Sequence, residues 1–217
     1  MGSDWFVEIL WFDEIESTQG YLIDALKSKS LKTPVCVGAT IQTSGRGSRG
    51  NSWIGEEGNF FISFAIERTF LPDDLKLESS SIYFATILKE VLEDLGSKVW
   101  LKWPNDFYLG EKKLGGLITN LAGDSLICGV GINLKNAPES FAIIDIEISP
   151  QKLSNLYMSR LKCFPSWKQI FSKFQLEFER SRSFSTHSQN TTIELKDAVL
   201  CEDGSLECNG QRIYSLR

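Results

Sequence analysis

The sequence predicts an α+β fold, in which strands form a sheet flanked by helices and a small β appendage follows. Apolar runs typical of strands recur along residues 5–134. Helical patterns with start and stop signals lie between and after these runs. Beyond residue 184 the chain changes to short strands separated by turns. We therefore expect a main domain over residues 1–184 and a short β domain over residues 185–217.

The strand-like segments are rich in apolar and β-branched side chains. They cover residues 5–15, 34–42, 59–67, 98–103, 115–122 and 125–134. None of these runs approaches the roughly 20 apolar residues that a membrane helix needs. The N-terminus has acids among its apolar residues and lacks the basic region of a signal peptide. We therefore expect a cytoplasmic protein.

Four helices are expected from caps, stops and apolar spacing. The aromatic residues of the fourth recur at helical spacing, so we interpret them as core. The signals are Ser17 or Thr18 for the first helix, residues 80–95 followed by Gly96 for the second, Ser149-Pro150 for the third and Pro165 for the fourth.

The tail, residues 191–217, consists of short strands split by "EDG" and "NG" turns. About thirty residues cannot bury much core alone. We therefore expect this β appendage to pack against the main domain.

Composition sets limits on function. The chain has 217 residues, a formal net charge of −5, 42% hydrophobic and 24% charged residues, as in ordinary globular domains. The negative charge argues against a broad nucleic-acid-binding face but allows a local positive pocket. The five cysteines include no C-x-x-C pair, and His187 is the single histidine. We expect reduced, mostly buried thiols, and neither a cysteine–histidine metal site nor a histidine-activated nucleophile.

The stretch "SGRGSRGNSW", residues 44–53, places three glycines and two arginines within six residues. Glycines allow positive φ and close approach of the backbone to a ligand. Arg46 and Arg49 can offer forked donors to carboxylate or phosphate. The G-x-G-x-x-G pattern of dinucleotide-binding folds fits poorly, because a strand follows the stretch instead of a helix. The phosphate-loop pattern G-x-x-x-x-G-K-[ST] also fits poorly, because Asn51 stands where its lysine belongs. We interpret the stretch as a cationic loop around an anionic ligand; a solvated surface loop is the alternative.

A second motif is "LKWPNDFYLGEKKLGG", residues 101–116. Lys102 ends an apolar strand, and the turn after it would expose Asp106. Lys113 leads into a glycine-flanked strand, so its ammonium can point into a cleft and neutralise an anion there. A plain charged β-turn is the alternative interpretation.

The third motif is "GVGIN", residues 129–133, which places two glycines inside a strand. Glycine weakens a strand unless another group must come close to its backbone. Asn133 carries both a donor and an acceptor, which suits an adenine edge. A bulge followed by a turn asparagine is the alternative.

Taken together, these motifs resemble those of biotin–protein ligases, the biotin–[acetyl-CoA-carboxylase] ligases. That family carries a G-R-G-R-x-G-like loop, then K-W-P-N-D, K-L-x-G and G-x-G-I-N, in this order. The corresponding residues are Gly45–Gly50, Lys102–Asp106, Lys113–Gly116 and Gly129–Asn133. The resemblance spans roughly residues 15–135, and "KWPND" followed by "KLGG" is specific. It implies a mixed, largely antiparallel sheet of the class II synthetase type and a small SH3-like β domain at the C-terminus.

The resemblance also implies a set of site residues. Lys113 and Arg46 would be catalytic, since they would meet the reacting carboxylate and phosphate. Asp106 would hold Mg²⁺ on the triphosphate. Biotin would be bound by Ser17, Thr18, Gln19, Gln42, Gly45, Arg46, Gly47, Ser48, Lys113 and Gly116. ATP and the adenylate would be bound by Arg49, Trp53, Asn59, Lys102, Asn105, Asp106 and Asn133.

The implied reaction has two steps and needs no nucleophile from the enzyme. Biotin and ATP give biotinyl-5′-AMP and pyrophosphate, and a lysine amine of an acceptor then displaces AMP. The implied acceptor is the biotin carboxyl carrier protein of a carboxylase. The cationic loop would close over the intermediate and exclude water from it.

Some family members also bind DNA through an N-terminal winged helix-turn-helix. Here the ligase-like pattern begins at about residue 5, so we expect a monofunctional ligase that binds no DNA and no membrane. Relatives pair through sheet edges, which makes a homodimer one expectation; the sequence leaves the oligomeric state open.

The sequence departs from the family pattern at three positions. Ser48 stands where many relatives have arginine, and Asn51 stands where many have a second basic residue. We therefore expect biotinyl-AMP to leave this protein faster than those relatives. Comparing the free biotinyl-AMP released by the wild type and by Ser48→Arg tests this expectation, and equal release would contradict it. Gln19 replaces the asparagine of the usual S-T-N, so one biotin-side or capping contact differs.

Two alternatives to the biotin ligase stay open. A lipoate–protein ligase shares the fold and the adenylate chemistry, but the "GRGSRG" and "KWPND" pair favours biotin. A non-catalytic module that binds biotin or a nucleotide would leave Lys113 and Asp106 idle and would release no pyrophosphate.

Overall fold

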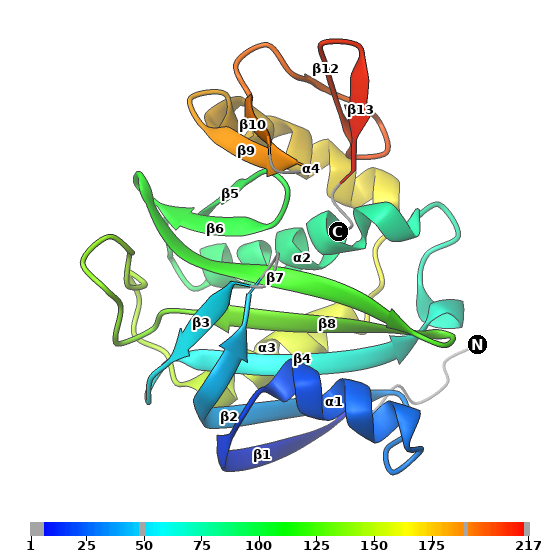
Figure 1. Ribbon diagram of the computed structural model, residues 1–217, viewed down its shortest axis with the longest axis vertical. Coiled ribbons are helices and arrows are strands. Elements are labelled where there is room, and N and C mark those ends of the chain that lie inside the picture. The colour runs from blue at the N-terminus through cyan, green and yellow to red at the C-terminus, as the bar shows by residue number, and fades with distance from the viewer. Residues whose placement is uncertain (1–6, 48–50, 189–190, 215–217) are drawn as a thin grey trace.

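The computed structural model describes residues 7–47, 51–188 and 191–214. A mixed sheet of eight strands lies at its centre, in the order β1-β2-β4-β8-β7-β6-β5, with β3 paired to β2 (Figure 1). Within the described sheet β1 and β2 run parallel, and the other neighbouring pairs are antiparallel. This confirms the predicted mixed, largely antiparallel sheet. The strands are β1 (Glu8–Ile15), β2 (Val35–Arg46), β3 (Ser52–Gly55), β4 (Phe60–Glu67), β5 (Trp100–Lys102), β6 (Asp106–Leu109), β7 (Lys112–Ala122) and β8 (Ser125–Ile132).

The four predicted helices are present. They are α1 (Thr18–Lys27), α2 (Ser80–Asp94), α3 (Pro150–Leu161) and α4 (Trp167–Ser181), with short 3₁₀ turns η2 (Arg68–Phe70) and η3 (Leu77–Ser79). Ser17 and Ser149 cap α1 and α3 with their hydroxyl groups. The fourth helix begins two residues later than predicted at Pro165, because Ser166 and Gln169 form a capping box.

The helices cover both faces of the sheet (Figure 1). On one face α1 buries Leu22 in a small cluster with Ala65. On the other face α2, α3 and α4 form the larger core, in which the Phe64 ring lies 5.2 Å from Phe84 and 5.7 Å from Tyr157, between centroids. Phe64 and Ala65 are neighbours on β4, so the two layers follow from the alternation of side chains along a strand.

The tail forms two small antiparallel sheets at one end of the molecule (Figure 1). One pairs β9 (Ser185–Ser188) with β10 (Thr191–Glu194), and the other joins β11 (Val199–Leu200), β12 (Leu206–Cys208) and β13 (Gln211–Ile213). Leu195, Ala198, Leu206 and Ile213 are buried in the same core cluster as α2 and α4. The tail therefore packs against the main domain as predicted, while the domain division at residue 184 stays a prediction.

The cysteines match the sequence expectation in part. All five thiols are free. Cys36 and Cys128 are buried, whereas Cys163 is exposed, and Cys201 and Cys208 are half-buried. The expectation that most would be buried is therefore wrong, because the last three lie outside the eight-stranded sheet. Across the described ranges, no helix has both the length and the apolar character needed to span a membrane.

Candidate active site

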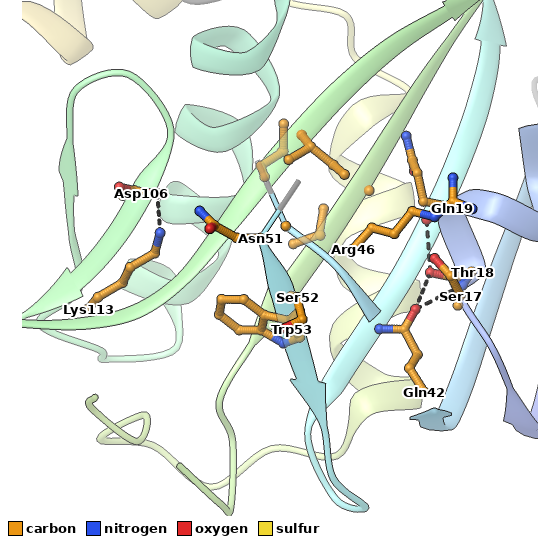
Figure 2. A pocket seen from close by; sticks show the side chains of 18 of the residues that line it. Ser17, Thr18, Gln19, Gln42, Arg46, Asn51, Ser52, Trp53, Asp106 and Lys113 are labelled. Carbon is orange, nitrogen blue, oxygen red and sulfur yellow. Dashed lines mark hydrogen bonds and ion pairs between the residues drawn. The ribbon is translucent and has the colours of Figure 1, made fainter. Parts of the chain in front are cut away.

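A cavity of about 340 Å³ opens between the start of α1, the β2–β3 hairpin and strands β7 and β8 (Figure 2). Among the predicted residues it is lined by Ser17, Thr18, Gln19, Gln42, Arg46, Gly47, Trp53, Asp106, Lys113 and Gly116. An adjoining groove of about 730 Å³ is lined by the predicted Gly45, Lys102 and Asn105. The fold therefore gathers most of the predicted site residues around one cavity and its extension.

The first turn of α1 forms a buried polar end of the cavity. Ser17 accepts a hydrogen bond from the Gly20 backbone N–H, so the helix begins at this point. The backbone N–H and the hydroxyl of Thr18 both donate to Oε1 of Gln42, at 2.8 and 3.0 Å. The Thr18 hydroxyl also lies 2.9 Å from the hydroxyl of Ser63 on β4. These bonds fix the Gln42 amide, so its Nε2 faces away from Thr18 (Figure 2).

Gln19 presents an unpaired oxygen at this end. The side chain is 3% exposed, and its Nε2 donates to Oδ1 of Asn120 at 3.0 Å. Its Oε1 has no hydrogen-bond partner among the described residues. A buried acceptor without a donor costs about 1–3 kcal/mol, so this oxygen suits a ligand that brings an N–H group.

The two strand glycines of "GVGIN" make room for side chains of the site. A Cβ atom at position 129 would lie 2.5 Å from Oε1 of Gln19, and one at position 131 would lie 2.9 Å from the Trp53 indole. The expectation that a group approaches this backbone is confirmed. The approaching groups are two side chains of the protein itself.

The opposite end of the cavity is charged. Lys113 on β7 points toward Asp106 on β6, and its Nζ lies 2.7 Å from Oδ1 of Asp106 (Figure 2). Gly116 faces Asp106 across the strand pair, where a Cβ atom would lie 3.3 Å from Oδ1. The sequence placed Asp106 in an exposed turn. Instead it begins β6 and is half-buried, because the hairpin closes between residues 103 and 105 and pairs Asp106 with Lys102.

The β5–β6 hairpin extends the charged end into the groove. Nδ2 of Asn105 donates to the backbone oxygen of Leu117, which ties the turn to β7. Nζ of Lys102 lies over the rings of Tyr108 and Phe184, 5.6 and 5.8 Å from their centroids. Burial and the charge of Asp106 raise the pKa of Tyr108 to about 12, so its phenol stays neutral.

The glycine/arginine loop begins where β2 ends. Arg46 pairs with Ser52 on β3, and the Gly47 N–H donates to the backbone oxygen of Asn51 at 2.7 Å, which closes the base of the loop. The Arg46 side chain extends toward the start of α1 (Figure 2). A Cβ atom at position 20 would lie 3.3 Å from the guanidinium, so Gly20 gives this arginine space. Ser48, Arg49 and Gly50 lie outside the described residues, and their roles stay predictions.

Asn59 and Asn133 line neither the cavity nor the groove. The sequence predicted that both contact adenosine, but the structure gives their amides backbone partners. Oδ1 of Asn59 accepts from three consecutive backbone N–H groups, at 2.9, 2.9 and 3.1 Å, in residues 134–136. Nδ2 of Asn133 donates to the backbone oxygen of Ala142 at 3.1 Å. Both amides are buried and hold the segment that carries Phe141 to the cavity wall.

Known proteins resemble this chain in both its motifs and its fold. The sequence profile of the biotin/lipoate A/B protein ligase family matches residues 11–135, which include every motif named above. The chain belongs to the biotin/lipoate A/B protein ligase family. A crystal structure of biotin acetyl coenzyme A carboxylase synthetase from Helicobacter pylori, with bound biotinylated ATP, is 38% identical and superimposes with a TM-score of 0.92. That match covers 96% of this chain and 100% of the Helicobacter chain.

Two curated members of the ligase family match about half of the chain. The bifunctional ligase/repressor BirA of Escherichia coli is 35% identical over 127 residues, which are 55% of this chain and 38% of BirA. The biotin–[acetyl-CoA-carboxylase] ligase of Paracoccus denitrificans is 29% identical over 132 residues, or 55% of this chain and 53% of that protein. The chain spans about two fifths of the length of the first curated relatives it matches.

Several lining residues of this ligase-family site were not predicted. Leu117, Ile118 and Val130 form its apolar wall. Ser63 was identifiable as the lone hydroxyl inside the apolar run of β4. No sequence signal indicated Phe141, whose ring lies 6.4 Å from the Trp53 ring, edge to face. Its position depends on a long segment that returns to the sheet.

Proposed function

We propose that the protein joins biotin to ATP as biotinyl-5′-AMP and then transfers the biotinyl group to a lysine of a biotin carboxyl carrier protein. The observation that carries this proposal is the opposition of two unlike ends in one cavity. One end is buried and offers hydrogen-bonding groups, and the other carries a lysine ammonium. A molecule with a polar head, an apolar chain and a terminal carboxylate would match both ends and the apolar wall between them.

The head end supports biotin as the acid. A ureido group carries two N–H donors and one carbonyl acceptor. Oε1 of Gln19 requires a donor, and the Nε2 of Gln42 can serve the acceptor. The Nε2 of Gln19 donates to Asn120, so the orientation of this amide is set before a ligand arrives.

The charged end supports adenylate formation. The biotin carboxylate would attack the α-phosphorus of ATP, the bond to the β-phosphate would break, and pyrophosphate would leave with the electron pair. Lys113 and Arg46 would stabilise the negative charge that develops on the phosphate oxygens. Asp106 would pair with the Lys113 ammonium until the anionic ligands take the place of Asp106 beside Lys113.

The residues present fit a magnesium ion that arrives with ATP. The part of the chain that the structure describes contains no group of three or more His, Cys, Asp or Glu side chains suited to a metal. Asp106 is the carboxylate among the cavity-lining residues. Magnesium is commonly held by one or two carboxylates together with phosphate oxygens and water. Asp106 would thus hold the ion, whose charge would offset that of the triphosphate.

The transfer step needs only access and exclusion of water. The acceptor lysine amine would form an amide bond with the biotinyl carbonyl carbon, and AMP would leave as that mixed anhydride bond breaks. The groove beside the cavity, lined by Lys102 and Asn105, supports entry of an extended lysine side chain. The acceptor we propose is the biotin carrier of a carboxylase, since the name of the Paracoccus relative gives acetyl-CoA carboxylase as its substrate.

A lipoate ligase is the second candidate, since the family includes both activities. The dithiolane head of lipoate offers no N–H group, so it would leave Oε1 of Gln19 unpaired. This observation favours biotin. A non-catalytic binding module is the third candidate, and it gives no reason for a lysine–aspartate pair at the far end of the cavity.

The test is acceptor labelling followed by intact mass. The protein is mixed with ATP, Mg²⁺, a biotin-carrier domain and either biotin or lipoate, with Lys113→Ala run in parallel. One added biotin that disappears with Lys113→Ala is the expected result. Lipoate transfer instead would support the second candidate. Pyrophosphate release with biotin but without transfer would reject the acceptor, and no signal in any arm would reject the ligase.

A further inference from the structure

We propose that the turn at residues 202–204, between β11 and β12, positions the charged end of the cavity, where ATP would react. This inference rests on the proposed function and extends it, because the C-terminal sheets are given a role in adenylate formation. The residue it acts through is Trp103, in the turn between β5 and β6. The structure carries this inference in three steps.

The first step is the contact between the two turns. The Trp103 side chain is fully buried, and its indole Nε1 donates to the backbone oxygen of Gly204 at 2.8 Å. The Trp103 backbone N–H donates to the hydroxyl of Ser181, the last residue of α4, at 3.0 Å. Trp103 lies between Lys102 and Asp106, which pair across the hairpin. A shift of this turn would therefore move the carboxylate that pairs with Lys113.

The second step is that the 202–204 turn is itself held on the main domain. Nε1 of Trp167 donates to the backbone oxygen of Glu202 at 2.8 Å. The Ser79 hydroxyl donates to the backbone oxygen of Asp203. The Asp203 carboxylate lies 3.2 Å from Nζ of Lys76 and 2.9 Å from Nη2 of Arg212. The turn is thus anchored through both its backbone and its side chain, which lets it act as a fixed support.

The third step is the fit of Gly204. Its φ is +77°, and a Cβ atom there would lie 2.8 Å from Cδ1 of Ile82 and 3.1 Å from the Trp167 ring. Gly210, in the next turn of the same sheet, has φ +75° but has nothing within 4 Å of its Cβ position. Alanine therefore meets comparable backbone strain at both positions, whereas it meets a packing conflict at position 204 alone.

The head end of the cavity provides an internal reference. Thr18, Gln19 and Gln42 lie on α1 and β2, and their hydrogen bonds involve neither turn. A positioning role thus predicts a change in the parameters for ATP without a matching change in affinity for biotin. A merely stabilising role predicts a lower melting temperature, while kcat/KM for ATP and Kd for biotin stay at their wild-type values.

The experiment compares Gly204→Ala and Trp103→Phe with Gly210→Ala and the wild type. Biotin-dependent exchange of pyrophosphate into ATP gives KM for ATP, calorimetry without ATP gives Kd for biotin, and a thermal melt monitors folding. Trp103→Phe keeps an aromatic ring and removes the indole donor, so it serves if Gly204→Ala does not fold. We expect kcat/KM for ATP to fall roughly tenfold in these two variants, as for a lost buried hydrogen bond. Biotin Kd should stay within about twofold in both variants, and Gly210→Ala should keep the wild-type kcat/KM for ATP and Kd for biotin.

Two outcomes overturn the inference and remain distinct from failure of the proposed function. Equal kcat/KM for ATP in Trp103→Phe and the wild type rejects the positioning role alone. An equal loss of biotin affinity and ATP turnover shows general damage and also rejects it. Absence of biotin-dependent exchange in the wild type rejects the proposed function, and the inference falls with it.

Discussion

The two ends of the cavity are built differently. At the head end, Thr18 bonds to both Gln42 and Ser63 at 2.8–3.0 Å, so their arrangement exists before a ligand arrives. At the charged end, the side chains of Lys113 and Asp106 are 29% and 24% exposed and hold each other through an ion pair. Recognition at the head end therefore depends on preorganised hydrogen bonds, whereas the charged end depends on an ion pair in which an anion can replace Asp106.

The largest effect should follow from breaking the charged end alone. Lys113→Ala should lower biotin-dependent pyrophosphate exchange about 10²–10³-fold, because it removes a donor from the developing charge. Biotin binding without ATP, measured by calorimetry, should change only a few-fold. Lys112→Ala is the matched control, since Nζ of Lys112 lies on the exposed side and donates to the backbone oxygen of Glu139 at 2.8 Å. Equal losses in the two lysine variants would contradict the assignment.

Breaking the head end should give a smaller effect on a different parameter. Gln19→Leu should weaken biotin binding about tenfold or more, because it leaves a ligand N–H unpaired at about 1–3 kcal/mol. KM for ATP should stay near the wild-type value. Asn120→Ala removes only the partner that orients the Gln19 amide, so its loss of biotin affinity should be smaller. An effect of Gln19→Leu on ATP that matches its effect on biotin would show that the two ends are not independent.

A third change tests the buried anchor that Asn59 provides for residues 134–136. Asn59→Ala removes the acceptor of three backbone N–H groups, so it should lower the free energy of unfolding by about 1–3 kcal/mol. The melting temperature should then fall by roughly 2–12 °C. Asn59→Asp keeps the acceptor oxygen and should lose less. Equal melting temperatures for Asn59→Ala and the wild type would show that the segment 134–136 is held by other contacts.

The smallest effect concerns the pH dependence of the C-terminal anchor. Hydrogen bonds from Ser205, Arg212 and Lys76 outweigh the burial of Asp203 and lower the pKa of its carboxyl group below the ordinary value of about 3.9. A carboxyl group with a lowered folded-state pKa stabilises the fold above its unfolded pKa and loses that contribution as pH falls. The difference in unfolding free energy between wild type and Asp203→Asn, from urea titrations, should therefore shrink from pH 7 to pH 3. A difference that is constant with pH would contradict the ionic role of Asp203.

Local features were predictable from the sequence because they depend on neighbours. Ser149 was identified as a helix start, the first helix was expected to begin at Ser17 or Thr18, and "NG" at residues 209–210 was identified as a turn. Caps, turns and strand alternation each involve residues a few positions apart. The start of α4 was missed by two residues because the capping box of Ser166 decides it, not Pro165.

The four helices, six of the eight strands of the main sheet and the family could be predicted from the sequence, because they depend on ordered motifs and short-range patterns. Strands β3 and β6 and the ion pair between Lys113 and Asp106 were not predicted. Which motif side chains reach the cavity depends on contacts between distant parts of the chain. Asn59 and Asn133 have the chemistry of ligand contacts, but backbone groups brought from elsewhere in the chain take up their amides. Gln19 lines the cavity, and Asn120, 101 residues later, orients its amide. Hydrogen-bond satisfaction in a buried site depends on such distant partners, and spacing along the chain does not encode them.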